Sequence, residues 1–178
     1  MTEELESLKR IVKKLEEGGF EYMLTGSMAM SFYSIPRMTR DSDIVIALND
    51  KDTEKFVKFL SEDFFINEFM VKESLEKNIM FNVFDKKTLF KIDFIIKLNA
   101  EYENLKFERR NRLKIEGFEI NVISIEDLII SKLMWSKESH SETQLNDIKS
   151  LLSKVVMKDY ILKKVSELSL KDIFSKIP

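Results

Sequence analysis

The sequence predicts an α/β (α+β) fold in which helices flank a mixed β-sheet and a helical segment follows at the C-terminus. Short apolar runs rich in β-branched and aromatic residues recur between residues 20 and 123, separated by stretches with helical periodicity. From residue 124 onwards only helical periodicity remains. No Pro/Gly-rich linker divides the chain, so we expect an α/β core over residues 1–124 and a helical segment over 125–178, packed together as one globular unit.

The first third of the chain alternates between helix and strand patterns. Residues 3–17 carry apolar side chains at helical spacing, and Gly18-Gly19 offers a left-handed stop. Short strands are expected over residues 20–24 and 43–48, with a short helix over 28–33 between them. Asn49 or Asp50 is expected to cap a helix that runs to about residue 60.

Two hairpins and four helices complete the predicted order. Strands over residues 78–84 and 89–98 are joined by Asp85-Lys86-Lys87, and strands over 107–115 and 118–123 are joined by Glu116-Gly117. Helices are expected over residues 125–138, 142–155, 158–167 and 171–176. Ser124 and Asp127 match a capping box, with Asp in place of the usual Glu or Gln.

The composition narrows the available chemistry. The 178 residues are 44% hydrophobic and 34% charged, which is typical of a globular protein. The formal net charge is -2, so the overall charge of the protein does not favour binding to nucleic acid. There is no cysteine and one histidine, which excludes disulfides, thiolate metal sites and multi-histidine sites in the chain. No signal-peptide pattern opens the sequence, and no apolar run reaches the ~18 residues of a membrane span, so we expect a cytoplasmic protein without membrane contact.

The most informative segment joins a glycine turn to a pair of carboxylates. Gly26-Ser27 follows a strand, and thirteen residues later Asp41-Ser42-Asp43 enters the next strand. Glycine permits a tight turn and close approach of the backbone to a phosphate, while strand geometry points residues 41 and 43 to one face. Two carboxylates about 4 Å apart repel by about 4 kcal/mol at an effective dielectric near 20, so a cation is needed. We expect Asp41 and Asp43 to bind Mg²⁺, with Mn²⁺ as an alternative, for a metal-chelated nucleoside triphosphate.

Asp93 is the candidate for a third carboxylate. It lies within a strongly strand-like run, Phe90 to Ile96, where a charge is costly unless it faces a site or a partner. Two-metal displacements use such a third ligand, and the same group can take a proton from the attacking hydroxyl.

These motifs together resemble the polymerase-beta nucleotidyltransferase superfamily, whose signature is Gly-Ser, a spacer of similar length, Asp-x-Asp and a third Asp on a later strand. The stretch from Arg37 to Asp43 resembles the minimal bacterial branch related to abortive-infection toxin nucleotidyltransferases of toxin-antitoxin systems. The segments around Lys132 and Asn146-Asp147 also resemble that branch, over residues 20–155 in all. Two positions depart from the pattern: Ser42 replaces an apolar residue, and Asn146 stands where Lys is common.

The resemblance implies a nucleotidyltransferase fold and transfer of a nucleoside monophosphate (NMP) from a nucleoside triphosphate (NTP), such as ATP, to a hydroxyl. The acceptor would be a tRNA end or a protein tyrosine or serine, and the partner a cognate toxin or antitoxin. Lys132 would contact the triphosphate, although a surface lysine explains that position equally well. Arg37 and Arg40 either meet phosphates or lie solvated in a loop.

Other interpretations of the sequence stay open beside this one. A non-catalytic protein of the same fold could bind a partner protein or a nucleotide without turning it over. The basic run from Lys106 to Lys114 is the one patch that could attract RNA, but solvated arginines on alternating strands explain it as well. Asp147 is expected to pair with a neighbouring cation, and His140 is expected in an exposed loop without a role.

Overall fold

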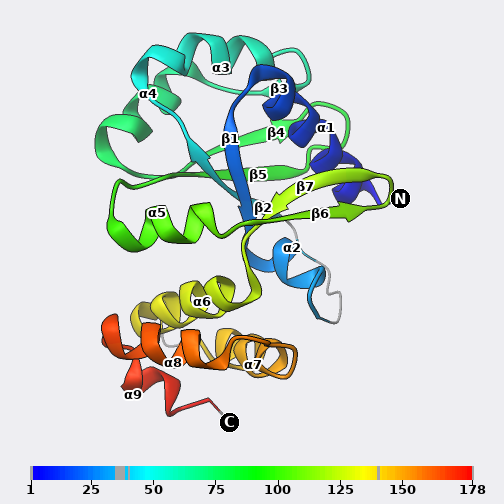
Figure 1. Cartoon of the computed structure of the whole chain (residues 1–178). Coiled ribbons are helices and arrows are strands. Elements are labelled where there is room, and N and C mark those ends of the chain that lie inside the picture. The colour runs from blue at the N-terminus through cyan, green and yellow to red at the C-terminus, as the bar shows by residue number, and fades with distance from the viewer. Residues whose placement is uncertain (1, 35–38, 40, 140, 178) are drawn as a thin grey trace.

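The computed structural model describes residues 2–34, 39, 41–139 and 141–177, and of Glu138 only the backbone. Within these residues one seven-stranded mixed sheet has the order β3-β4-β5-β2-β1-β7-β6. The sheet and its helices form one layered body, with the helices after β7 gathered on one side (Figure 1). The strands are β1 (Glu21–Thr25), β2 (Asp41–Ala47), β3 (Phe64–Phe65), β4 (Phe81–Asp85), β5 (Lys91–Ile96), β6 (Asn111–Ile115) and β7 (Phe118–Val122).

The helices flank this sheet in the predicted α/β arrangement. They are α1 (Glu3–Gly18), α2 (Gly26–Ser31), the 3₁₀ turn η1 (Asp50–Asp52), α3 (Thr53–Leu60), α4 (Glu68–Lys77), α5 (Glu101–Glu108), α6 (Ile125–Ser139), α7 (Glu142–Leu152), α8 (Lys158–Glu167) and α9 (Lys171–Phe174). Thr2 caps the start of α1 by accepting a hydrogen bond from the Leu5 amide, and Gly19 ends the helix at φ 70°. None of the helices in the described residues combines the length and the hydropathy that spanning a bilayer requires.

The central strands separate an apolar face from a polar one. β2 lies between β1, which is antiparallel to it, and β5, which is parallel to it. On one face Phe94 of β5 packs edge-on against Phe56 of α3 at 5.4 Å between ring centroids and stacks with Phe81 at 5.1 Å. Because side chains alternate along a strand, the residues next to these core positions point to the opposite face. That second face lies toward α6 and carries the polar residues of the site.

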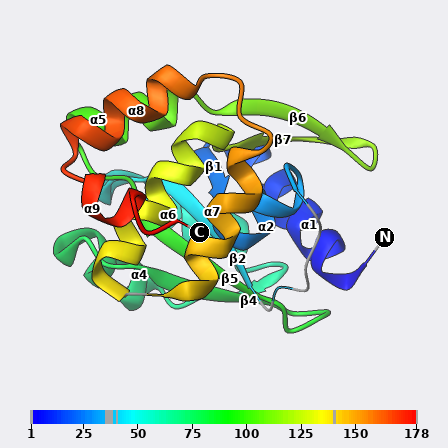
Figure 2. The ribbon, with the colours of Figure 1, turned by 90° about the horizontal axis from the view of Figure 1, so that it is seen from below.

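Helix α6 is the centre of the C-terminal helices. It contacts α7, α8 and α9 as well as α2, and Figure 2 shows it seen from below beside α7 and α9. Its buried Asp127 accepts hydrogen bonds from the hydroxyls of Tyr102 (3.0 Å) and Tyr160 (2.7 Å) and from Arg109 Nε (2.9 Å). These bonds tie α6 to α5 and α8, and burial beside Asp127 raises the pKa of Tyr160 well above its usual range. The network fixes the position of α6 against the core.

Several sequence predictions needed correction. Residues 107–110 are not a strand: α5 runs to Glu108, and the strand begins at Asn111. α2 begins at Gly26, two residues before the predicted start, and β2 begins at Asp41, two residues before the predicted strand. The predicted capping box is formed in a modified way: Ser124 Oγ accepts from the Asp127 amide and donates to the Asp127 carboxylate, which also accepts from the tyrosines and Arg109. The predicted α/β fold class, both hairpin turns and the four C-terminal helices are otherwise confirmed.

Candidate active site

The carboxylates singled out in the sequence lie on neighbouring strands of one sheet face. Asp41 and Asp43 are two residues apart on β2, so they point to the same side. In the parallel pairing of β2 with β5, Asp43 stands opposite Asp93 and Asp41 stands opposite Lys91. The crossover between these strands therefore brings residues about fifty positions apart in the sequence into register.

The glycine turn abuts this acidic face directly. Thr25, the last residue of β1, pairs with Asp43, and Gly26 follows it at φ 67°. A Cβ atom built on Gly26 would lie 1.9 Å from Asp43 Oδ2, so no other residue fits without moving the carboxylate. Glycine is needed here for both its backbone angle and its missing side chain.

Lys91 binds two of the three carboxylates, and the sequence reading overlooked it. Its Nζ lies 2.7 Å from Asp93 Oδ2 and 3.3 Å from Asp41 Oδ2. The hydrogen bond with Asp93 is the main cause that raises the pKa of Lys91 above its usual value. Its position two residues before Asp93 on the same strand is the signal that would have placed it on this face.

The electrostatics of the face centre on Asp43. Burial, reinforced by the charges of Asp41 and Asp93, raises the pKa of Asp43 to about 6, while Lys91 and Lys132 oppose that rise. The ionised form of a carboxylate that lies beside two others is repelled by them, so a bound cation would stabilise that form strongly. The face is therefore short of positive charge even with Lys91 in place.

The oxygen donors of this face are of the kind that a hard divalent cation binds. As the described residues stand, no three acidic or imidazole side chains are grouped closely enough to hold a metal ion. The three carboxylates nevertheless share one face, their oxygens are the ligands Mg²⁺ prefers, and the ammonium between Asp41 and Asp93 shows that a cation is accommodated there. Asp41, Asp43 and Asp93 are the residues that could hold it.

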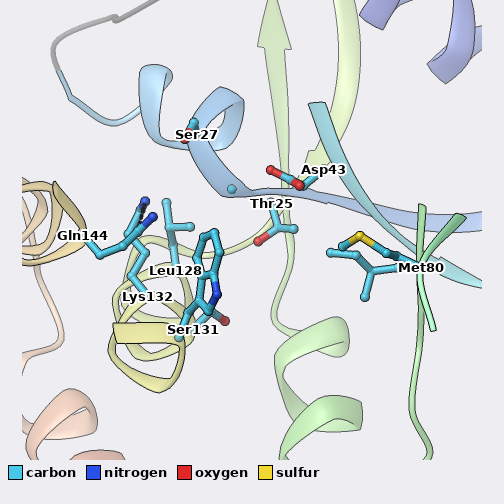
Figure 3. A pocket seen from close by; sticks show the side chains of 11 residues that line it. Thr25, Ser27, Asp43, Met80, Leu128, Ser131, Lys132 and Gln144 are labelled. Atoms are coloured by element: carbon cyan, nitrogen blue, oxygen red, sulfur yellow. Dashed lines mark hydrogen bonds between the residues drawn. The ribbon is translucent and has the colours of Figure 1, made fainter. Parts of the chain in front are cut away.

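A cavity of about 220 Å³ opens beside this face, between the sheet and α6. It is lined by Thr25, Gly26, Ser27, Asp43, Met80, Ile95, Leu128, Ser131, Lys132, Trp135 and Gln144. Figure 3 shows Asp43 and Thr25 facing Leu128 and Ser131 across this space, with Ser27 on the side of Lys132 and Gln144. The cavity thus connects the glycine turn with the acidic face.

Lys132 lies inside the molecule and not on the surface that the alternative interpretation assumed. It is 5% exposed, and its Nζ lies 2.8 Å from Asp147 Oδ2 and 2.8 Å from Gln144 Oε1, both on α7. A buried ammonium needs such partners, and its place at the cavity wall keeps it near Ser27. Asp147 is confirmed as the partner of a cation, whereas Gln144 had no signal in the sequence.

The arginines of the basic run are ion-paired among the described residues. Arg109 pairs with Asp127, Arg110 Nη2 lies 3.4 Å from Glu21, and Arg112 binds Glu16 and Glu119. Each arginine of the run is therefore largely neutralised by a carboxylate. Arg37, Arg40 and His140 lie outside the described residues.

Comparisons with known structures agree on the fold. An antigenic nucleotidyltransferase-like protein from Paracoccidioides brasiliensis is similar with a TM-score of 0.59 at 20% identity, covering 98% of this chain and 92% of that one. ANT(2″)-Ia in complex with adenylyl-2″-tobramycin gives a TM-score of 0.64 at 10% identity, covering 94% and 98%. The lincosamide antibiotic adenylyltransferase LnuA, with lincomycin bound, gives 0.58 at 16% identity, covering 87% and 99%.

Sequence comparison supplies the family. No curated protein sequence matches the chain. The family described as nucleotidyl transferase of unknown function (DUF2204) matches residues 4–173, which is nearly the whole chain. The protein therefore belongs to this nucleotidyl transferase family and has the nucleotidyltransferase fold.

Proposed function

We propose that this protein catalyses metal-dependent transfer of an NMP from an NTP to an acceptor hydroxyl, with release of pyrophosphate. One observation carries the proposal: Asp41, Asp43 and Asp93 share a sheet face against which the Gly26 turn is packed so closely that a Cβ would strike Asp43. A phosphate held at the turn would lie beside a metal held by the carboxylates. Family membership supports the same class of reaction.

Each residue has a role in the proposed reaction. Asp41, Asp43 and Asp93 would hold Mg²⁺, or Mn²⁺ in its place, which when bound supplies positive charge for the α-phosphate and the leaving pyrophosphate. Asp93 accepts the proton of the acceptor hydroxyl. The hydroxyl oxygen then bonds to the α-phosphorus as the bond from that phosphorus to the pyrophosphate oxygen breaks.

The β- and γ-phosphates of the NTP would bind on the side of the cavity formed by the Gly26 turn. The turn at Gly26 offers backbone amides and Ser27 a hydroxyl, and the Lys132 ammonium lines the same wall. We assign the contacts of the β- and γ-phosphates to these three residues. Arg37 and Arg40 belong to the segment between the turn and Asp41, and we propose that they add further phosphate contacts.

The acceptor is proposed to be a hydroxyl of RNA or protein, such as a tRNA end or a tyrosine or serine side chain, within a toxin-antitoxin pair. The paired arginines described above lend no support to RNA. Two of the similar structures are named with tobramycin and lincomycin, so hydroxylated small molecules form a third class to test.

The experiment is label transfer from each α-³²P-labelled NTP with Mg²⁺, using total RNA, lysate protein and hydroxylated antibiotics as separate acceptor pools. Wild-type protein is expected to label one pool with a matching release of pyrophosphate, and Asp41→Asn/Asp43→Asn is expected to label none. Folded wild-type protein that labels no pool with any NTP contradicts the enzyme proposal. Unlabelled pools together with intact nucleotide or partner binding in the double variant would favour the non-catalytic alternative.

A further inference from the structure

One face of α6 forms a wall of the cavity. Leu128, Ser131, Lys132 and Trp135 all line it, at the i, i+3, i+4 and i+7 spacing that places side chains on one side of a helix. Lys132 bonds to α7 and marks the polar end near Ser27. The other three residues of this face, Leu128, Ser131 and Trp135, take no part in the proposed phosphate contacts.

The lining residues outside the proposed phosphate contacts are mainly apolar, and we call them the Trp135 end of the cavity: Met80, Ile95, Leu128, Ser131 and Trp135. Trp135 is 59% exposed and Met80 is 56% exposed, although both are large apolar side chains. Ligand-binding pockets are typically lined by large apolar and aromatic side chains of this kind. An indole in particular offers a flat face on which another ring can stack.

A single unsatisfied hydroxyl lies among these apolar groups. Ser131 Oγ is buried and has no hydrogen-bond partner among the described residues. A buried polar atom without a partner is costly, which calls for a ligand atom that supplies the missing bond. The ligand part that fits is flat, apolar on its faces and polar at its edge.

The size and place of the cavity identify that ligand part. Its volume of about 220 Å³ is below the about 300–1,000 Å³ of pockets that enclose a whole drug-sized ligand, so a larger ligand would be only partly enclosed, with one ring system inside. The same cavity reaches Gly26, Ser27 and Asp43, where the phosphates are proposed to bind. A ring joined to a triphosphate is a nucleoside triphosphate.

We propose that the Trp135 end of the cavity binds the nucleobase of the NTP donor, with the indole of Trp135 stacked on the base and Ser131 Oγ bonded to its edge. This inference rests on the proposed function and adds the part of the protein that recognises the donor. It also makes α6 a shared wall, with Lys132 on the phosphates and Trp135 on the base one turn apart.

The test exploits the fact that Trp135 is the single tryptophan of the chain. Titration with each NTP and Mg²⁺ is expected to change the intrinsic fluorescence. Magnesium tripolyphosphate, which has no base, is expected to displace a labelled NTP yet leave the fluorescence of Trp135 nearly unchanged. Calorimetry should show Trp135→Leu weakening NTP binding about tenfold or more without altering tripolyphosphate binding, and Trp135→Phe retaining most of it.

The outcomes separate this inference from the proposed function. An NTP that binds without changing the fluorescence, and whose affinity Trp135→Leu leaves unaltered, overturns the base assignment. If label transfer persists in that case, the proposed function stands and the base lies elsewhere. If neither NTP nor tripolyphosphate binds the folded protein, both proposals fail together. Ser131→Ala is expected to lower the affinity for the preferred base more than for the others, and equal losses for all bases contradict the hydrogen bond to the base edge.

Discussion

Replacement of Gly26 by alanine tests whether the turn and the acidic face form one unit. The new Cβ would lie 1.9 Å from Asp43 Oδ2 and 2.8 Å from its Cγ, well inside van der Waals contact. Since Asp43 lies on β2 with paired strands on both sides, its backbone is held and its carboxylate has to rotate away. The change should therefore displace a proposed metal ligand without removing it.

The magnitude follows from two contributions. A non-glycine residue at φ 67° costs about 1–2 kcal/mol, and an off-rotamer Asp43 side chain adds about 0.5–1.5 kcal/mol. We expect Gly26→Ala to lower the free energy of unfolding by about 2–3 kcal/mol. Gly19→Ala is the matched control, because Gly19 has a similar φ of 70° and no atom within 4 Å of its added Cβ. That control should lose only the backbone contribution of about 1–2 kcal/mol.

Urea denaturation measures both losses, and label transfer and Mn²⁺ binding measure the site. Displacement of a reacting group by about 1 Å can cost about 100-fold in rate, so we expect at least that loss for Gly26→Ala and near-normal activity for Gly19→Ala. Equal stability losses in the two variants, with full activity in Gly26→Ala, would refute the packing of the turn against Asp43.

Four other substitutions test the surrounding charges and packing. The pKa of Asp43 is raised to about 6 from the usual 3.8, so the folded state holds this proton more tightly than the unfolded state. The free energy of unfolding should therefore fall as pH rises from 4 to 6, by at most about 3 kcal/mol. Without metal, Asp43→Asn should therefore gain stability over wild type as pH rises from 4 to 7 in urea titrations, and a pH-independent difference contradicts this. Lys91→Met should lower the melting temperature in EDTA and bind Mn²⁺ roughly tenfold more tightly by electron paramagnetic resonance, whereas Lys91→Arg should match wild type. Asp147→Ala should cost about 3–5 kcal/mol in urea because Lys132 keeps a buried charge, and a loss below about 1 kcal/mol argues against that. Ser42 is fully buried and its hydroxyl has no partner among the described residues, so Ser42→Ala should raise the free energy of unfolding in urea titrations by about 1 kcal/mol, and a decrease would indicate a missed contact.

The parts of the site that depend on local geometry could be predicted from the sequence. Asp41 and Asp43 share a face because strand side chains alternate, and Gly26 is needed because of its backbone angle. Asp93 was suggested by a charge in an apolar strand, and the β2–β5 register places it opposite Asp43. In each case a short-range rule carried the information.

The parts that depend on tertiary packing could not be predicted in the same way. Lys132 resembles a surface lysine until α7 brings Asp147 and Gln144 against it. α5 was missed because, of its eight residues, only Lys106 and Phe107 are buried, which leaves almost no apolar periodicity. The spacing from Asp93 places Lys91 on the same face, but its contact with Asp41 depends on pairing with a strand fifty residues earlier, which a local pattern does not specify.

The most direct test of the site is a crystal structure with Mn²⁺ and a non-hydrolysable NTP, using anomalous scattering to locate the metal. The account predicts a manganese peak bonded to Asp41 and Asp43, with the triphosphate against Gly26 and the Lys91 ammonium moved from between the carboxylates. A bound NTP whose metal and phosphates lie away from these aspartates would contradict it.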